Sequence, residues 1–195
     1  MIGEQALKQE YTVAKKKSAK PMLWISMISM VMFFAGLTSA YVISMKRDDW
    51  VSFDLPEAFY ISTLLIVLSS ITLFLSQRFL KQDKRQLSLI MILVTLILGI
   101  GFIWQQYVGF NQLKSVGLFF TGPESTVSTS FIIGITFMHV LHLFAGVIVL
   151  LVVIYNHFKY KYKSDDMLGF ELGAIFWHFV DLLWIYLFFF FYFIR

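Results

Sequence analysis

Residues 169–195 read GFELGAIFWHFVDLLWIYLFFFFYFIR, and this stretch decides the fold of the chain. It is long enough to cross a membrane, for which about 20 consecutive apolar residues suffice. It nevertheless carries Glu171, His178 and Asp181. At about 100° per residue, Glu171 and His178 lie about 20° apart around a helix and Asp181 about 60° from His178, so the three share a face. Ionisable groups in a membrane are costly unless they meet partners inside protein, so neighbouring helices must cover that face.

The composition also indicates a membrane protein. Apolar residues make up 58% of the 195 residues and charged residues 14%, and the mean hydropathy is +0.75. A soluble domain of this size could not bury so much apolar surface. The absence of cysteine excludes disulfides, Cys-ligated zinc, iron–sulfur clusters, covalently attached haem and a thiolate-bridged copper pair. Basic residues lie in short segments beside apolar runs, which indicates membrane topology, and no nucleic-acid partner is expected.

Five apolar segments predict an all-α, polytopic membrane protein built as a bundle of five transmembrane helices. The predicted spans are about 22–45, 58–77, 87–107, 128–155 and 172–194. Residues 1–21 form a polar, basic N-terminal tail ahead of a membrane domain that comprises residues 22–195. The first apolar run exceeds the roughly 7–15 residues of a signal-peptide core, so cleavage of this tail is not expected.

The distribution of basic residues predicts the orientation. Of the 16 Lys and Arg residues, twelve lie in the N-terminal tail, the second–third connection and the fourth–fifth connection, and four lie on the opposite side. Cytoplasmic segments carry the excess of Lys and Arg. The sequence therefore predicts a cytoplasmic N-terminus and a C-terminus outside.

Small and polar residues follow one face in several predicted spans. This helix-packing stripe consists of Ser26, Ser29, Gly36 and Ala40 in the first span and Thr95, Gly99 and Gln106 in the third. Small residues let membrane helices approach closely, and hydroxyls and amides form hydrogen bonds between them. We therefore interpret the stripe as a packing surface.

The histidines inside the predicted spans allow two interpretations. A non-covalent b-type haem needs two axial ligands from facing helices, and His139 or His142 could supply one while His178 supplies the other. The spacing of His139 and His142 could also serve another metal. Alternatively, His139, His142, Glu171, His178 and Asp181 form a structural intramembrane polar network of satisfied hydrogen bonds. We adopt the structural interpretation and assign no catalytic, cofactor-binding or metal-binding residue.

Three sequence blocks carry a family resemblance. They comprise residues 169–171 (GFE), 176–181 (FWHFVD) and Trp184; Ser130, Phe131, Thr136, residues 139–142 (HVLH) and Gly146; and residues 95–99 (TLILG), Phe102 and Gln106. Together they resemble subunit III of the haem–copper terminal oxidases, with the cytochrome c oxidase type favoured, in its short five-helix form. Long members have seven spans, and their two additional N-terminal helices help to wall a lipid-filled cleft. Met30 stands where long members carry a membrane glutamate.

This resemblance implies a non-catalytic subunit of a proton-pumping oxidase in aerobic respiratory electron transport. It implies catalytic subunit I and subunit II as partners, haems and copper in those partners and none in this chain, and bound phospholipid. The implied role is to support assembly, lipid binding and sustained turnover as a multi-pass protein of the bacterial plasma (inner) membrane. Membership of a larger respiratory supercomplex is left open. Independently, four histidines and no cysteine are too few for the haem and copper ligands of the other two subunits.

Two alternatives belong to other functional classes. The first is a haem b-binding membrane anchor of a quinol-linked oxidoreductase. The second is a small transporter that uses Glu171, His178 and Asp181 as a proton relay. Transporters typically show repeats and helices broken by Gly or Pro, whereas Pro21, Pro56 and Pro123 all lie outside the predicted spans.

Overall fold

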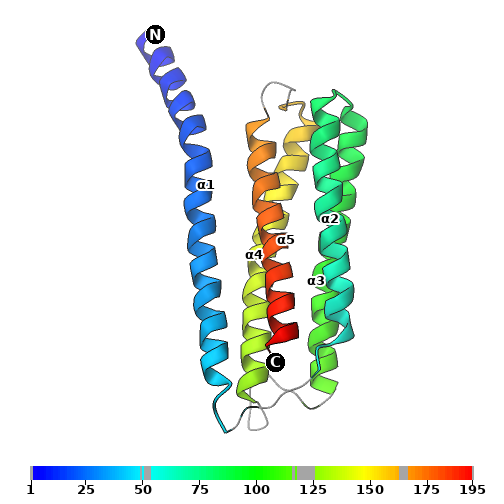
Figure 1. Ribbon diagram of the computed structural model, residues 1–195. Coiled ribbons are helices and arrows are strands. Elements are labelled where there is room, and N and C mark those ends of the chain that lie inside the picture. Colours follow the sequence, from blue (N-terminus) through cyan, green and yellow to red (C-terminus); the bar gives the residue numbers. More distant parts are fainter. Residues whose placement is uncertain are drawn as a thin grey trace.

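A computed structural model describes residues 2–48, 50, 54–115, 117, 126–162 and 167–194. Its helices are α1 (Ile2–Ser44), α2 (Glu57–Lys81), α3 (Arg85–Ser115), α4 (Val127–Phe158) and α5 (Leu168–Phe193) (Figure 1). No strand occurs among the described residues. All five helices are long and apolar enough to cross a membrane. The predicted all-α, five-span membrane fold is therefore confirmed.

The helices run alternately up and down, so the two ends of the chain lie at opposite ends of the bundle (Figure 1). The start of α1, the α2–α3 turn, the end of α4 and the start of α5 all lie at one end. These are the parts of the chain in which the sequence concentrates Lys and Arg. The arrangement places the basic segments on a common side, and the assignment of that side to the cytoplasm stays a prediction.

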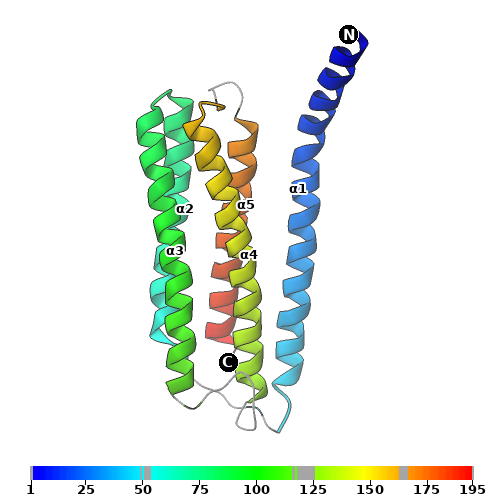
Figure 2. The same cartoon turned by 180° about the vertical axis from the view of Figure 1, so that it is seen from behind.

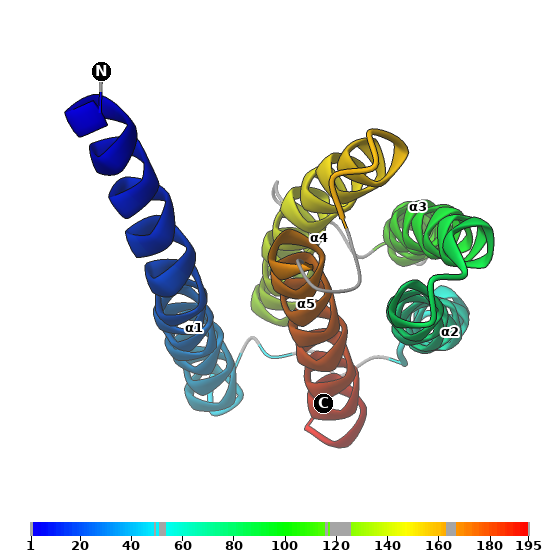
Figure 3. The same cartoon turned by 90° about the horizontal axis from the view of Figure 1, so that it is seen from above.

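Seen along the helices, the bundle has three parts (Figure 3). The helices α2 and α3 form an antiparallel pair, α4 and α5 lie beside it, and α1 lies on the far side of α4 and α5. The helix α5 contacts α1, α2 and α4, and Trp177 and Trp184 on α5 are among the largest side chains that are fully buried. The helix α4 likewise contacts α1, α3 and α5, so α4 and α5 together form the centre of the bundle.

The predicted N-terminal tail is helical and continuous with the first span. The helix α1 begins at Ile2 and includes Pro21, although the sequence places this proline outside the spans. Figure 2 shows the N-terminal part of α1 extending past the ends of the other helices. Residues 2–20 consist largely of Ala, Lys, Glu and Gln, which favour helix. A single proline removes one backbone hydrogen bond and is tolerated in long membrane helices.

Buried hydroxyls and amides join α2 to α3. Thr72 and Thr95 lie 2.8 Å apart through their Oγ1 atoms, and Gln106 donates from Nε2 to Oγ of Ser62 at 2.9 Å. The predicted stripe residues of α3, Thr95, Gly99 and Gln106, are all buried. Hydrogen bonds between buried polar groups fix the pairing of these helices, because hydrocarbon offers them no other partner.

The stripe residues of α1 have a different environment. Ser26, Ser29 and Gly36 are exposed and Ala40 is half-buried. Ser26 and Ser29 donate from Oγ to carbonyl oxygens four residues earlier in their own helix, at 3.0 and 3.1 Å. Outside the neighbouring backbone of α1, no atom of the described residues lies within 4 Å of the Cβ position of Gly36. This part of the stripe therefore faces away from the other described helices.

Candidate functional site

The three ionisable residues of α5 have different surroundings. Glu171 lies near the start of the helix, where its Oε2 is 2.9 Å from Nζ of Lys20 on α1. The side chains of Lys20 and Glu171 are 50% and 30% exposed. This ion pair joins the outlying α1 to the central helix, although half-exposed pairs contribute only about 0–1 kcal/mol.

His178 and Asp181 lie deeper in the bundle. Nδ1 of His178 lies 2.6 Å from Oγ of Ser70 on α2, and both residues line a shallow hollow between α2 and α5. Asp181 is only 2% exposed. Neither of its carboxyl oxygens has a hydrogen-bond partner among the described residues. A buried polar group without a partner is costly, and the hydroxyl of Ser70, which lies close enough to interact with this carboxyl group, lessens that cost.

The histidines of α4 lie among aromatic rings. The ring of His139 is fully buried, with centroids 6.4, 5.9 and 5.2 Å from the rings of Phe34, Phe102 and Trp184 respectively. Neither of its nitrogens has a hydrogen-bond partner in the part of the chain that the structure describes. His142 donates from Nδ1 to the carbonyl of Met138 at 2.7 Å. Phe34 of α1 also contacts His142, at 5.5 Å between ring centroids.

The structure therefore brings His139 and His142 together around Phe34, while Glu171 and His178 of α5 pair with α1 and α2 respectively. Among the hydrogen bonds of the described residues, none joins two members of the predicted network. Lys20 and Ser70 are partners that the sequence did not single out. Their positions depend on how the helices are rotated, which hydropathy does not reveal. A common role of the five residues in assembly stays a prediction.

Two indole groups of α5 also bind α2. Trp177 donates from Nε1 to Oγ of Ser69, and Trp184 donates from Nε1 to Oγ1 of Thr63, both at 3.0 Å. A buried tryptophan has an N–H group that needs an acceptor, and the hydroxyls of α2 supply it. These bonds fix the rotation of α5, and with it the directions of His178 and Asp181.

An apolar cavity of about 300 Å³ lies between α1 and α5. It is lined by Val31, Phe34, Ala35, Phe179, Leu182, Leu183 and Tyr186. At one side of the cavity, Oγ1 of Thr38 lies 3.1 Å from the hydroxyl of Tyr186. The other side chains that line the cavity are apolar, so the cavity suits a hydrocarbon chain better than a polar ligand.

The histidines of α4 and α5 have separate surroundings. Across the described ranges, no group of three or more His, Asp or Glu residues could hold a metal ion. His139 packs against Trp184 in the interior, whereas His178 faces Ser70 of α2. The two rings thus have separate neighbours.

Comparison with known proteins decides the family. The model of the family described as cytochrome c oxidase subunit III matches residues 1–195. The chain belongs to the cytochrome c oxidase subunit III family. It is 26% identical over 201 residues to cytochrome c oxidase subunit 3 of Podospora anserina, covering 96% of this chain and 71% of the relative. The corresponding protein of Bos taurus is 24% identical over 198 residues, covering 96% and 74%.

Family membership confirms the resemblance found in the three sequence blocks. Cytochrome c oxidase subunit 3 of Latimeria chalumnae, 25% identical over 198 residues, likewise covers 96% of this chain and 74% of the relative. The matched blocks contain the residues that build the centre of this subunit III fold. Trp177 and Trp184 anchor α5 to α2, and Phe102 and His139 contact each other. Met30 packs partly buried against the apolar core.

Proposed function

We propose that the chain is the non-catalytic subunit III of a proton-pumping haem–copper oxidase of the cytochrome c oxidase type. The observation that carries this proposal is the family match over residues 1–195. The curated relatives are named cytochrome c oxidase subunit 3. Oxygen reduction takes place in the partner subunits I and II, which hold the haems and copper. None of the contacts among the described residues favours the haem-bearing anchor or the transporter.

The proposed contribution of the chain is to hold its neighbour and lipid in place. The exposed stripe of α1, with Ser26, Ser29 and Gly36, provides a smooth surface on which a helix of the catalytic subunit can pack closely. The apolar cavity between α1 and α5 provides room for an acyl chain of a phospholipid. Both features lie on α1, so we place the lipid between the partner-facing helix and the rest of the subunit.

The chain is a multi-pass membrane protein, and we propose the bacterial plasma (inner) membrane as its location. The basic segments at one end of the bundle support a cytoplasmic N-terminus. The curated relatives named above come from a fungus and from animals, so fractionation of the native host tests this point directly.

The proposal is tested by deleting the subunit and purifying the oxidase. The depleted enzyme should keep its haem spectrum and its early turnover, because the redox centres lie elsewhere. It should then lose activity faster than the complete enzyme during catalysis, because the lipid and packing support is gone. Altered haem content, or no turnover from the start, would contradict the proposal.

A second measurement addresses the chain itself. Extraction in mild detergent should recover it with subunits I and II, and a pyridine haemochrome spectrum of the separated chain should show no haem. Stoichiometric haem b on the separated chain would instead support the membrane anchor of a quinol-linked oxidoreductase.

A further inference from the structure

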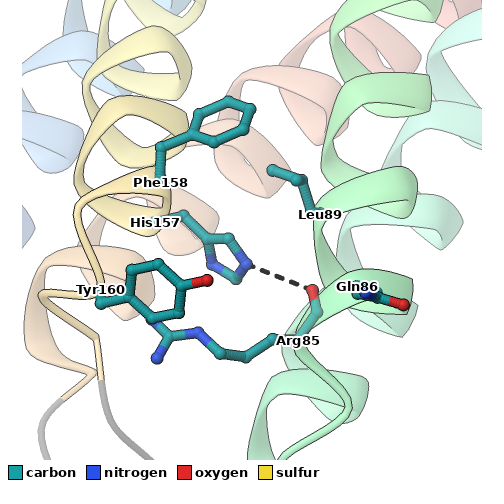
Figure 4. A pocket seen from close by; sticks show the side chains of 6 residues that line it. All are labelled: Arg85, Gln86, Leu89, His157, Phe158 and Tyr160. Atoms are coloured by element: carbon teal, nitrogen blue, oxygen red, sulfur yellow. Dashed lines mark hydrogen bonds between the residues drawn. The ribbon is translucent and has the colours of Figure 1, made fainter.

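A small pocket of about 100 Å³ lies where α3 begins and α4 ends, away from the groove of α1 (Figure 4). Its lining consists of Arg85, Gln86, Leu89, His157, Phe158 and Tyr160. Figure 4 shows Arg85 and Tyr160 at one end, Leu89 and Phe158 at the other, and His157 between them. A space of about 10–15 Å³ admits one water molecule, so the pocket has room for a group the size of a phosphate.

The cationic side chain in this pocket is held in place by the protein. Arg85 donates from Nη2 to the carbonyl of Tyr162 at 3.0 Å, and its guanidinium carbon lies 4.4 Å from the ring centroid of Tyr160. Tyr160 has a φ of 55°, which is uncommon for a residue other than glycine, and this local conformation accompanies the placement of its ring over Arg85. The guanidinium is therefore preorganised before any ligand arrives.

Two polar groups in the pocket have hydrogen-bonding capacity that the described residues do not use. Among the described residues, Arg85 has no carboxylate within ion-pair distance, and only one of its five N–H donors is accounted for by a hydrogen bond to protein. His157 is 4% exposed and lies 3.3 Å from the carbonyl of Arg85 through Nε2, which must donate. Its Nδ1 is buried and has no partner in the described part of the chain. An anion could accept from the unused N–H groups of Arg85, and also from Nδ1 of His157 once that ring carries a second proton.

We propose that this pocket binds the phosphate of an anionic phospholipid headgroup. One phosphate oxygen accepts from the free N–H groups of Arg85, and another accepts from Nδ1 of His157, whose protonated ring the bound anion stabilises. Leu89 and Phe158 provide an apolar exit for the acyl chains, which a free phosphate would not need. This inference deepens the lipid binding proposed above and rests on it for the ligand class.

The surroundings of the pocket favour an anionic lipid over a neutral one. Exposed Lys84 and Lys159 flank the pocket on the neighbouring segments, and the exposed rings of Tyr155 and Phe158 lie where aromatic residues mark a membrane–water interface. Basic pockets between membrane helices on the cytoplasmic side bind anionic headgroups. With the proposed orientation, the pocket opens at the cytoplasmic leaflet.

The test measures lipid binding to the chain purified in mild detergent with whichever subunits accompany it. After detergent washing, dihexanoylphosphatidylglycerol is added and native mass spectrometry counts the bound molecules. His157→Gln keeps a donor for the carbonyl of Arg85 but lacks Nδ1, so one lipid molecule should bind about tenfold more weakly. Arg85→Gln should weaken the same molecule about 100-fold. Arg78→Gln, which removes a charge at the same end of the bundle outside the pocket, should leave its binding unchanged.

Parallel arms separate the possible ligands. Dihexanoylphosphatidylcholine that binds this position as tightly as the anionic lipid would overturn the proposal, as would displacement of the lipid by millimolar inorganic phosphate. Equal lipid counts in wild type and both pocket variants would also overturn it. If Arg85→Gln fails to assemble, His157→Gln and Arg85→Lys provide the test. Arg85→Lys keeps the positive charge but loses the planar guanidinium group that can form two parallel hydrogen bonds, so this variant should bind the lipid about tenfold more weakly. Failure of the proposed oxidase function would appear separately, as the absence of subunits I and II from the preparation.

Discussion

A Cβ atom on Gly99 of α3 would lie 2.6 Å from Cη2 of Trp177 on α5. Trp177 is fully buried, and its indole N–H is bound to Ser69 on α2. The ring therefore spans the junction of three helices and has little freedom to move. Close-packed interiors respond to even one additional methyl group.

The first prediction follows from this contact. Gly99→Ala should lower the stability of the subunit by about 1–3 kcal/mol, because the new methyl group overlaps the indole ring. The measurement is the thermal unfolding of the purified subunit in detergent. Gly101→Ala is the matched control on the same helix, because its nearest side-chain atom would be 3.6 Å away. Equal melting temperatures for the two variants would show that the ring shifts without cost.

Hydropathy predicts the helices of this chain better than it predicts their ends. The predicted span 172–194 and the helix α5 (Leu168–Phe193) agree closely, because an apolar run flanked by polar residues has visible limits. In the structure, residues 2–21 extend the first span as one continuous helix. These residues have a strong helix propensity, but their charged side chains give them a low hydropathy. A polar segment that forms a helix and a polar tail without structure have similar hydropathy, so hydropathy alone does not distinguish them.

The site was harder to predict than the fold. Helical spacing places Glu171, His178 and Asp181 on one side of a helix, but their partners depend on which helices lie beside that side. The indole bonds of Trp177 and Trp184 to α2 set the rotation of α5, and this rotation directs His178 toward Ser70. Such side-chain contacts between distant segments leave no periodic signal in the sequence.

The second prediction concerns Asp181, whose carboxyl oxygens have no partner among the described residues. Asp181→Asn should change the free energy of unfolding by less than about 0.5 kcal/mol, because it breaks no hydrogen bond of the described structure. Ser70→Ala should cost about 1 kcal/mol, because it removes the 2.6 Å bond to His178. Thermal unfolding and oxidase turnover are measured for both. Normal assembly of Asp181→Asn combined with immediate loss of turnover would indicate a proton relay.

The third prediction concerns orientation. The chain has no cysteine, so single cysteines can be introduced without background labelling. Asp48→Cys, just after α1, should react with a membrane-impermeant maleimide on intact spheroplasts. Gln82→Cys, in the α2–α3 turn, should react only after permeabilisation, because basic connections are retained in the cytoplasm. The reverse pattern would invert the proposed topology.

The last prediction concerns the outward face of α1. Outside the neighbouring backbone of α1, no atom lies within 4 Å of the Cβ position of Gly36, so Gly36→Leu should not lower the stability of the separated subunit. In the oxidase, the large side chain should hold α1 away from the catalytic subunit and weaken retention of this subunit about tenfold during detergent washing.

Val42→Leu is the control, because it adds bulk to an exposed position of α1 that lies about 120° away around the helix. Retention is measured as the ratio of this subunit to subunit I in the washed complex. If Gly36→Leu and Val42→Leu are retained equally well, another face of the subunit must contact its neighbour. The exposed stripe of α1 would then face lipid, and its small residues would reflect only the packing of acyl chains against the helix.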